Sequence, residues 1–204
     1  LRDVGGFDAA GDAYSRAMQL YEGNQADVPS ILAEIELGQA RAHIARGDLG
    51  MAAERLQLAD ARVTDRMPPR VQGTVEQVRA ELARSRGQYQ TALDAWREAA
   101  AIYQRAQMPF DEIIVRRALG EMLRTVGNRP AAITSLEQAA DRARSIDAPA
   151  ILVEVLAALA EASQDRAILA EAAERSAALG SRQLQAEVEL ARARLSLPDP
   201  SDAG

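Results

Sequence analysis

Three glycines recur at a spacing of 40 residues, and this spacing restricts the fold of the chain more than any other feature. They are Gly47, Gly87 and Gly127, and each lies between two stretches with helical periodicity. The composition is rich in alanine, arginine, leucine and glutamate, which are strong helix formers, and alternating β-type runs are short. We therefore predict an all-α fold built from a repeated helical unit.

Other residues keep a constant distance from each glycine. Small, large and small side chains follow in turn, and then a proline: Ala52, Leu56, Ala59 and Pro69; Ala92, Trp96, Ala99 and Pro109; Ala132, Leu136, Ala139 and Pro149. Partial copies begin at Gly5, with Ala10, Tyr14 and Ala17, and at Asp165, with Ala170 and Ala177. A left-handed glycine ends the first helix, the alanines allow close helix contact, and proline suits the next helix start. Each unit is thus predicted to be an antiparallel helix pair.

We expect a single repeat domain over residues 1–197, with about ten helices. Its predicted parts are a half repeat at 5–26, repeats at 27–66, 67–107, 108–147 and 148–179, and a capping helix at 181–197. Residues 198–204 are predicted to be a disordered tail. Trp96, Tyr14 and Tyr89 are expected to pack between helices.

Composition excludes several classes of function. The chain has no cysteine, one histidine (His43, expected to be packed) and a net charge of -6. A thiol site, a disulfide framework or a general nucleic-acid binder is therefore not expected, and no phosphate-loop or metalloprotease motif occurs. We predict no enzyme activity, cofactor or metal. No apolar run is long enough to cross a membrane and no export signal is visible, which favours a cytoplasmic location.

The repeated pattern, together with small residues late in each first helix (Ala40, Ala80 and Gly120), resembles the tetratricopeptide repeat. The family's usual unit has 34 residues. Longer units are similar to those of kinesin light chains and of the sensor arms of bacterial maltose-regulator and LuxR-type ATP-dependent transcription regulators. The alanine and arginine bias favours the bacterial comparison. The resemblance implies a right-handed α-solenoid.

The resemblance also implies a function in protein–protein interaction. We expect a non-catalytic scaffold that binds a protein or peptide, as the repeat arm of a larger bacterial regulator, without direct contact to nucleic acid or membrane. The alternative is an effector-sensing domain for a small molecule or peptide. In that case the apolar residues Leu152, Val155 and Leu159 would provide the binding surface.

By the same resemblance, the first helices of the pairs line a binding groove. Its candidate residues are Glu34, Arg41, Gln77, Glu81, Arg84, Arg117, Glu121, Arg124 and Arg192. Arginine binds carboxylates in a bidentate manner, so the groove could hold an acidic or C-terminal peptide segment. Alternatively, the arginines pair with Glu81, Glu121 and their neighbours on a solvated face, for little net free energy.

The N-terminal helix carries an apolar seam with no preceding helix in the sequence to cover it. Phe7, Tyr14 and Tyr21 lie on this seam at helical spacing. We predict either that the chain is a fragment of a longer protein or that the seam forms a homodimer through the N-terminal helix.

Overall fold

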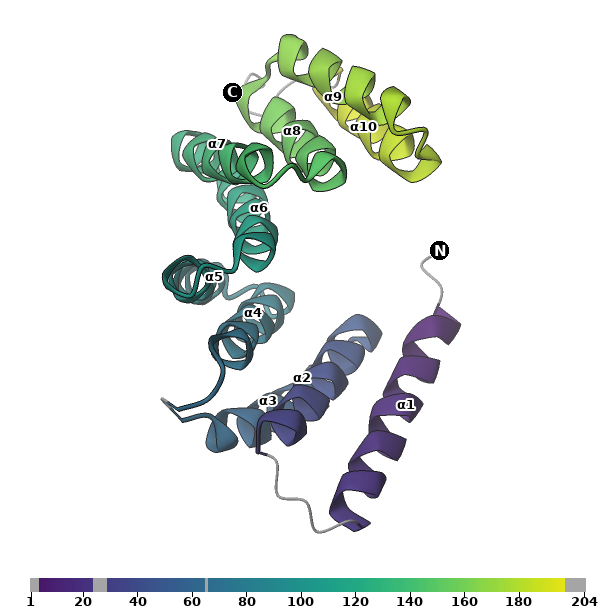
Figure 1. The fold of residues 1–204 in the computed structure, drawn as a ribbon, viewed down its shortest axis with the longest axis vertical. Coiled ribbons are helices and arrows are strands. Elements are labelled where there is room, and N and C mark those ends of the chain that lie inside the picture. The colour runs from purple at the N-terminus through teal and green to yellow at the C-terminus, as the bar shows by residue number, and fades with distance from the viewer. Residues whose placement is uncertain (1–3, 24–28, 65, 197–204) are drawn as a thin grey trace. The chain divides into compact units, whose positions relative to one another are not determined.

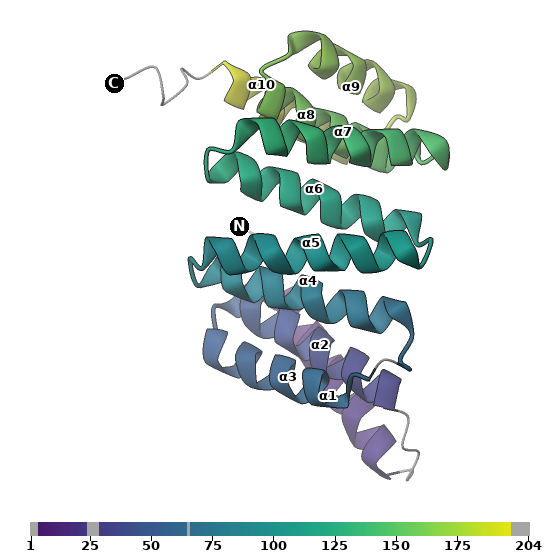
Figure 2. The same cartoon turned by 90° about the vertical axis from the view of Figure 1, so that its left-hand side faces the viewer.

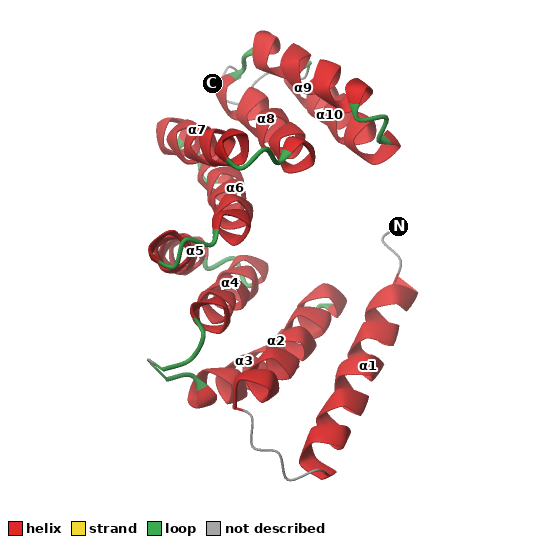
Figure 3. Cartoon of the chain, in the orientation of Figure 1, coloured by secondary structure: helices red, strands yellow, loops and turns green. Residues whose placement is uncertain are grey.

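The computed structural model describes residues 4–23, 29–64 and 66–196; in its first helix, side chains are described for residue 9 and residues 11–20. These residues form ten helices and no strand, which confirms the all-α prediction (Figures 1 and 3). The helices are α1 (Val4–Gly23), α2 (Pro29–Arg46), α3 (Leu49–Arg62), α4 (Pro69–Ser85), α5 (Tyr89–Arg105), α6 (Pro109–Thr125), α7 (Arg129–Ser145), α8 (Pro149–Ser163), α9 (Arg166–Ala178) and α10 (Arg182–Leu195).

The repeat glycines end the first helix of each pair as predicted. Gly47, Gly87 and Gly127 have φ angles of 86°, 73° and 82°, in the left-handed region that a side chain disfavours. Pro69, Pro109 and Pro149 begin α4, α6 and α8. The chain therefore reverses at each glycine, and the two helices of a pair, such as α4 and α5, lie side by side (Figure 2).

The small and large side chains that recur at constant spacing in the chain form the packing layer between the helices. The predicted alanines of the three complete copies are fully buried: Ala52, Ala59, Ala92, Ala99, Ala132 and Ala139. The large residues between them, Leu56, Trp96 and Leu136, are buried as well. At Gly120 a Cβ atom would lie 2.5 Å from Leu136 Cγ, so only glycine admits this approach of α6 to α7.

The chain divides into two compact units, Leu1–Met108 (unit 1) and Pro109–Gly204 (unit 2). In unit 1, apolar side chains from α2, α3 and α4 form a core that includes Leu37, Leu56 and Val78. In unit 2, the core joins α6 to α10 and includes Val153 and Leu156. The expected division into one domain over residues 1–197 stays a prediction, and the tail at 198–204 lies outside the described residues.

The left-handed residue that begins the last partial repeat lies one position earlier than predicted. Gln164, not Asp165, has the left-handed φ angle of 61°. Counted from Gln164, the two small-residue positions fall on Leu169 and Ser176, which are buried, whereas Ala170 and Ala177 are exposed. The prediction was wrong here because the residue in the left-handed conformation, not the next acidic residue, sets the phase of α9.

Two of the three aromatic residues expected in the core are exposed. Trp96 is buried as predicted, but Tyr89 is 48% exposed because it is the first residue of α5, where no second helix covers it. Tyr14 is 37% exposed and contacts α2 with only part of its ring. The capping stripe on α10 is buried at Leu184 and Val188. In the described part of the chain, no helix combines the length and apolarity needed to cross a membrane.

Candidate functional site

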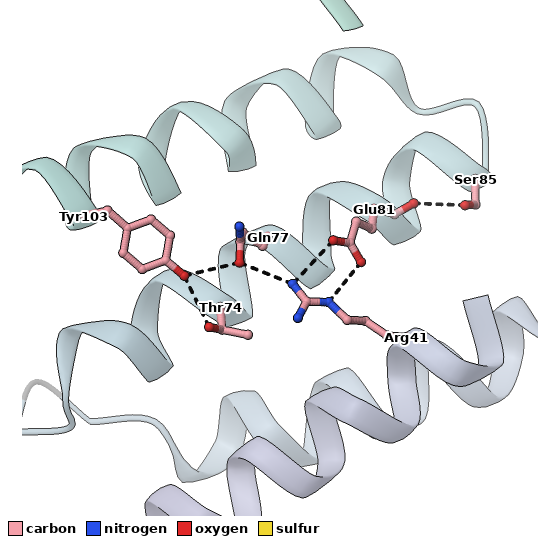
Figure 4. A network of polar contacts seen from close by, with 6 residues as sticks. All are labelled: Arg41, Thr74, Gln77, Glu81, Ser85 and Tyr103. Atoms are coloured by element: carbon pink, nitrogen blue, oxygen red, sulfur yellow. Dashed lines mark hydrogen bonds and ion pairs between the residues drawn. The ribbon is translucent and has the colours of Figure 1, made fainter. Parts of the chain in front are cut away.

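Arg41 joins the first helices α2 and α4 of unit 1 (Figure 4). Its Nε donates to Glu81 Oε2 at 3.2 Å, and its Nη2 donates to Glu81 Oε1 at 3.4 Å. The same Nη2 donates to Gln77 Oε1 at 3.2 Å. Three of the predicted groove residues are therefore in direct contact, on the face of α2 and α4 that we call the inner face of unit 1.

Tyr103 of α5 extends this network, although it was not among the residues selected from the sequence. Its hydroxyl donates to Gln77 Oε1 at 3.2 Å and lies 3.2 Å from Thr74 Oγ1. The ring is fully buried against Gly73, where a Cβ atom would lie 2.5 Å from it. A glycine inside α4 opposite a tyrosine of the paired helix was the one signal available in the sequence.

A pocket of about 390 Å³ opens beside this network in unit 1. It is lined by Tyr14, Glu34, Leu37, Gly38, Arg41, Ala42, Arg70 and Thr74, which come from α1, α2 and α4. The Tyr14 ring lies on Gly38, since a Cβ atom there would be 2.2 Å from Tyr14 Cζ. The pocket brings together two predicted groove residues, Glu34 and Arg41, with the one predicted interface residue whose side chain is described, Tyr14.

The charged side chains around this pocket differ in whether they have an interaction partner. Arg41 is paired with Glu81, and Arg70 also has an interaction partner. Thr74 donates its hydroxyl hydrogen to the Arg70 carbonyl at 2.7 Å. Glu34 is exposed, and within the described residues it makes no hydrogen bond or ion pair. Its negative charge is therefore not neutralised by a neighbouring side chain.

Arg84 does not join the Arg41 network in the contacts the structure gives it. Its guanidinium lies over the ring of Trp96 on α5, with 5.6 Å between Cζ and the ring centroid. This is a cation–π contact between the two helices of one pair. In the next repeat the corresponding residues are Arg124 and Leu136, so the aromatic ring is absent there.

In unit 2 the predicted arginines pair with glutamates. Arg117 contacts Glu154 of α8 and lies 3.8 Å from Glu121 of its own helix. Arg124 Nη2 lies 3.2 Å from Glu161 Oε2, and Arg194 of α10 lies 3.0 Å from Glu161 Oε1.

Arg192 pairs with Glu189 on its own helix. The paired arrangement that the sequence left open is thus the one present. A peptide carboxylate would compete with these glutamates for the arginines.

Burial changes the acidity of one carboxyl group in unit 2. Desolvation raises the pKa of Glu154 above its ordinary value. Arg117 opposes this increase, whereas the negative charges of Glu187 and Glu121 add to it. The carboxyl group therefore holds its proton to a higher pH in the folded protein than in the unfolded chain.

The three apolar residues that were predicted to bind an effector do not lie on the surface. Leu152, Val155 and Leu159 are 3%, 0% and 5% exposed. They are buried because α8 is covered by α7, α9 and α10. The side chains of Phe7 and Tyr21 lie outside the described residues.

His43 is mostly buried, with Nδ1 3.7 Å from Asp48 Oδ2. Among the described residues, no three His, Asp or Glu side chains form a group that could hold a metal ion.

Residues 74–145 match the family model of the tetratricopeptide repeat (TPR). The match covers about a third of the chain, and the fold of the described residues is TPR-like. The search of curated proteins found no match. Several solved structures share the fold at low sequence identity, so the similarity is evidence for the TPR-like architecture alone.

Aspartyl phosphate phosphatase F from Bacillus subtilis is 11% identical, with a TM-score of 0.69 over 87% of this chain and 48% of that one. A signal transduction ATPase with numerous domains and a TPR sensor, from Pyrococcus horikoshii, is 16% identical, with a TM-score of 0.67 over 89% of this chain and 28% of that one. BtubC (BKLC) from P. vanneervenii is 14% identical, with a TM-score of 0.64 over 98% and 94%. The chain thus spans less than half the length of the first two proteins.

Proposed function

We propose that this TPR-like chain is a non-catalytic protein-interaction scaffold, and that it is the repeat arm of a larger bacterial regulatory protein that controls transcription. The observation that carries the proposal is the pocket on the inner face of unit 1. Three helices contribute side chains to it, and Glu34 there has no structural partner among the described residues. A charged group that does not serve the fold is available for a partner.

A regulatory setting for such an arm has a precedent in one of the similar structures. That structure belongs to a signal transduction ATPase that carries a TPR sensor. This chain covers 28% of that protein, which is the relation expected between a repeat arm and a multidomain regulator. The TPR-like fold supplies the binding surface, and the rest of the regulator would supply the activity.

Two threonine variants test the proposal with the chain immobilised on a column. Thr74 and Thr134 both donate to the carbonyl four residues earlier, but only Thr74 lines the pocket. We expect the wild type and Thr134→Arg to retain a specific protein from the lysate of the source bacterium, and Thr74→Arg to lose it. Equal retention by both folded variants would place the binding surface elsewhere.

The second candidate function is effector sensing, and the size of the pocket favours it. A volume of about 390 Å³ lies in the range of about 300–1,000 Å³ that is typical of small-molecule sites. A sensor would show a thermal shift with a fraction of the metabolite pool, and this shift would vanish in Thr74→Arg. A scaffold would show no shift and would still retain its protein partner.

A further inference from the structure

The inner-face pocket of unit 1 has the chemistry of a cation site, which is the opposite of the carboxylate clamp suggested by its arginines. Arg41 is already paired with Glu81 and hydrogen-bonded to Gln77, so this cluster presents little net positive charge to a ligand. Glu34 has no partner among the described residues. Arg70 also lines the pocket and has an interaction partner, so the charged lining group without a partner among the described residues is the Glu34 carboxylate.

An aromatic ring lies close to this carboxylate. The Tyr14 ring occupies the place where a side chain of residue 38 would begin, because a Cβ atom there would fall 2.2 Å from Tyr14 Cζ. Residues 34 and 38 are one helical turn apart, so their Cβ positions lie about 5–6 Å from each other. The ring and the carboxylate can thus contact the same bound group, one by its π face and the other by charge.

The remaining lining suits the stem of such a group. Leu37 and Ala42 lie at the apolar floor of the pocket, with only 1% and 5% of their surface exposed. Thr74 donates its only hydroxyl hydrogen to the Arg70 carbonyl, and its oxygen, which lies 3.2 Å from the Tyr103 hydroxyl, has a second lone pair that can accept a hydrogen bond. A carboxylate, a ring face and an acceptor oxygen around an apolar floor fit a cationic head on a hydrocarbon chain.

We propose that this pocket binds an alkylammonium or alkylguanidinium group, with the head between Glu34 and Tyr14. The group is either the Lys or Arg side chain of a protein partner or a free small amine. The inference rests on the proposed function, and it names the ligand chemistry of that surface. The net charge of -6 on the chain favours a cationic ligand over an anionic one.

An NMR titration of the whole chain tests the proposal with three probes. They are n-butylammonium, the blocked peptide acetyl-Ala-Lys-Ala-amide, and the neutral control acetyl-Ala-norleucine-Ala-amide. We expect at least one amine to shift the Tyr14 ring signals at concentrations where the neutral peptide does not. Binding of the lysine peptide alone indicates a protein side chain as the source, whereas binding of butylammonium alone indicates a free amine.

Matched variants assign the binding to the two named groups. Glu34→Gln should weaken the binding of the amine by about fivefold. Glu54 is an exposed carboxylate on α3 outside the pocket, so Glu54→Gln should not change the affinity. Tyr14→Leu should weaken it by about two- to fivefold, whereas Tyr14→Phe, which keeps the ring, should not. Circular dichroism of each variant checks that it is folded.

The outcomes separate this inference from the proposed function. Absence of amine binding, equal binding of the neutral peptide, or unchanged affinity in Glu34→Gln would overturn the cation site. If Thr74→Arg still abolished retention of a protein in that case, the proposed function would stand without it. If neither the amines nor any protein bound, both would fall.

Discussion

Four residues that stand 40 positions apart on successive first helices show how differently the two units use the same place in the repeat. In unit 1, the side chains of Arg41 and Glu81 pair while 41% and 29% exposed. In unit 2, Glu121 is 45% exposed, but the Glu161 side chain is only 8% exposed and lies between Arg124 and Arg194. The repeat position is constant and the environment is not.

The neighbouring helix accounts for this difference. Glu161 is buried because α10 packs on α8 and brings Arg194 to it. In unit 1, Arg41 borders an open pocket. We infer that the buried Glu161 serves the stability of unit 2, whereas Glu34, one turn from the floor of the pocket, is left for a ligand in unit 1.

The largest expected effects concern the packing layer, in which the two units should not differ. Trp96 in unit 1 and Leu136 in unit 2 stand at the same repeat position, and both are buried. We expect Trp96→Ala to lower the free energy of unfolding by about 3–5 kcal/mol and Leu136→Ala by about 2–5 kcal/mol. Urea unfolding followed by circular dichroism measures both. A loss below about 1 kcal/mol in one unit only would show that its core contributes less than its burial implies.

Neutralising the paired carboxylates should affect the stability of the two units to different degrees. Glu161→Gln removes the charge that two arginines share in a buried position, and we expect a loss of about 1.5–3 kcal/mol. Glu81→Gln weakens a half-exposed pair, and we expect a loss of less than about 1 kcal/mol. The same urea experiment compares the two variants, and equal losses of unfolding free energy would contradict the distinction between the two units.

The smallest effect is a pH dependence confined to unit 2. Because burial raises the pKa of Glu154 in the folded state, the folded protein binds this proton more tightly than the unfolded chain. The stabilising contribution is fully present below the unfolded pKa and is lost as the pH rises through the raised pKa.

Gln resembles the protonated carboxyl group, so wild type should lose stability relative to Glu154→Gln over this range. Thermal unfolding at several pH values measures the difference, and a constant difference would contradict the raised pKa.

The helix pairs were predictable from the sequence because each of their signals acts locally. A left-handed glycine, a proline in the first turn and two alanines on one helix face need no knowledge of distant contacts. The prediction failed at α9, where Gln164 adopts the left-handed conformation without being glycine. It failed also at Tyr89, whose periodicity is correct but whose position at the end of α5 leaves it uncovered.

The candidate site could be predicted only in part. The residues Arg41, Gln77 and Glu81 were selected by their place in the repeat, and the structure brings them into contact. Their mutual pairing was one of two alternatives that the sequence left open. Tyr103 and Arg70 were not selected, because their roles depend on side chains that reach the inner face from another helix or helix start.

The sequence by itself therefore determined the repeat, the glycine and proline positions at the helix ends of the three complete copies, and the packing layer, since these follow from backbone preferences and side-chain size within about 40 residues. Only the tertiary structure decided which charges are neutralised. Charge pairing depends on the distance between side chains of different helices, and a difference of a few ångströms separates a paired arginine from a free one. That distance leaves Glu34 as the uncompensated group in the pocket of unit 1 and holds Glu161 between two arginines in unit 2.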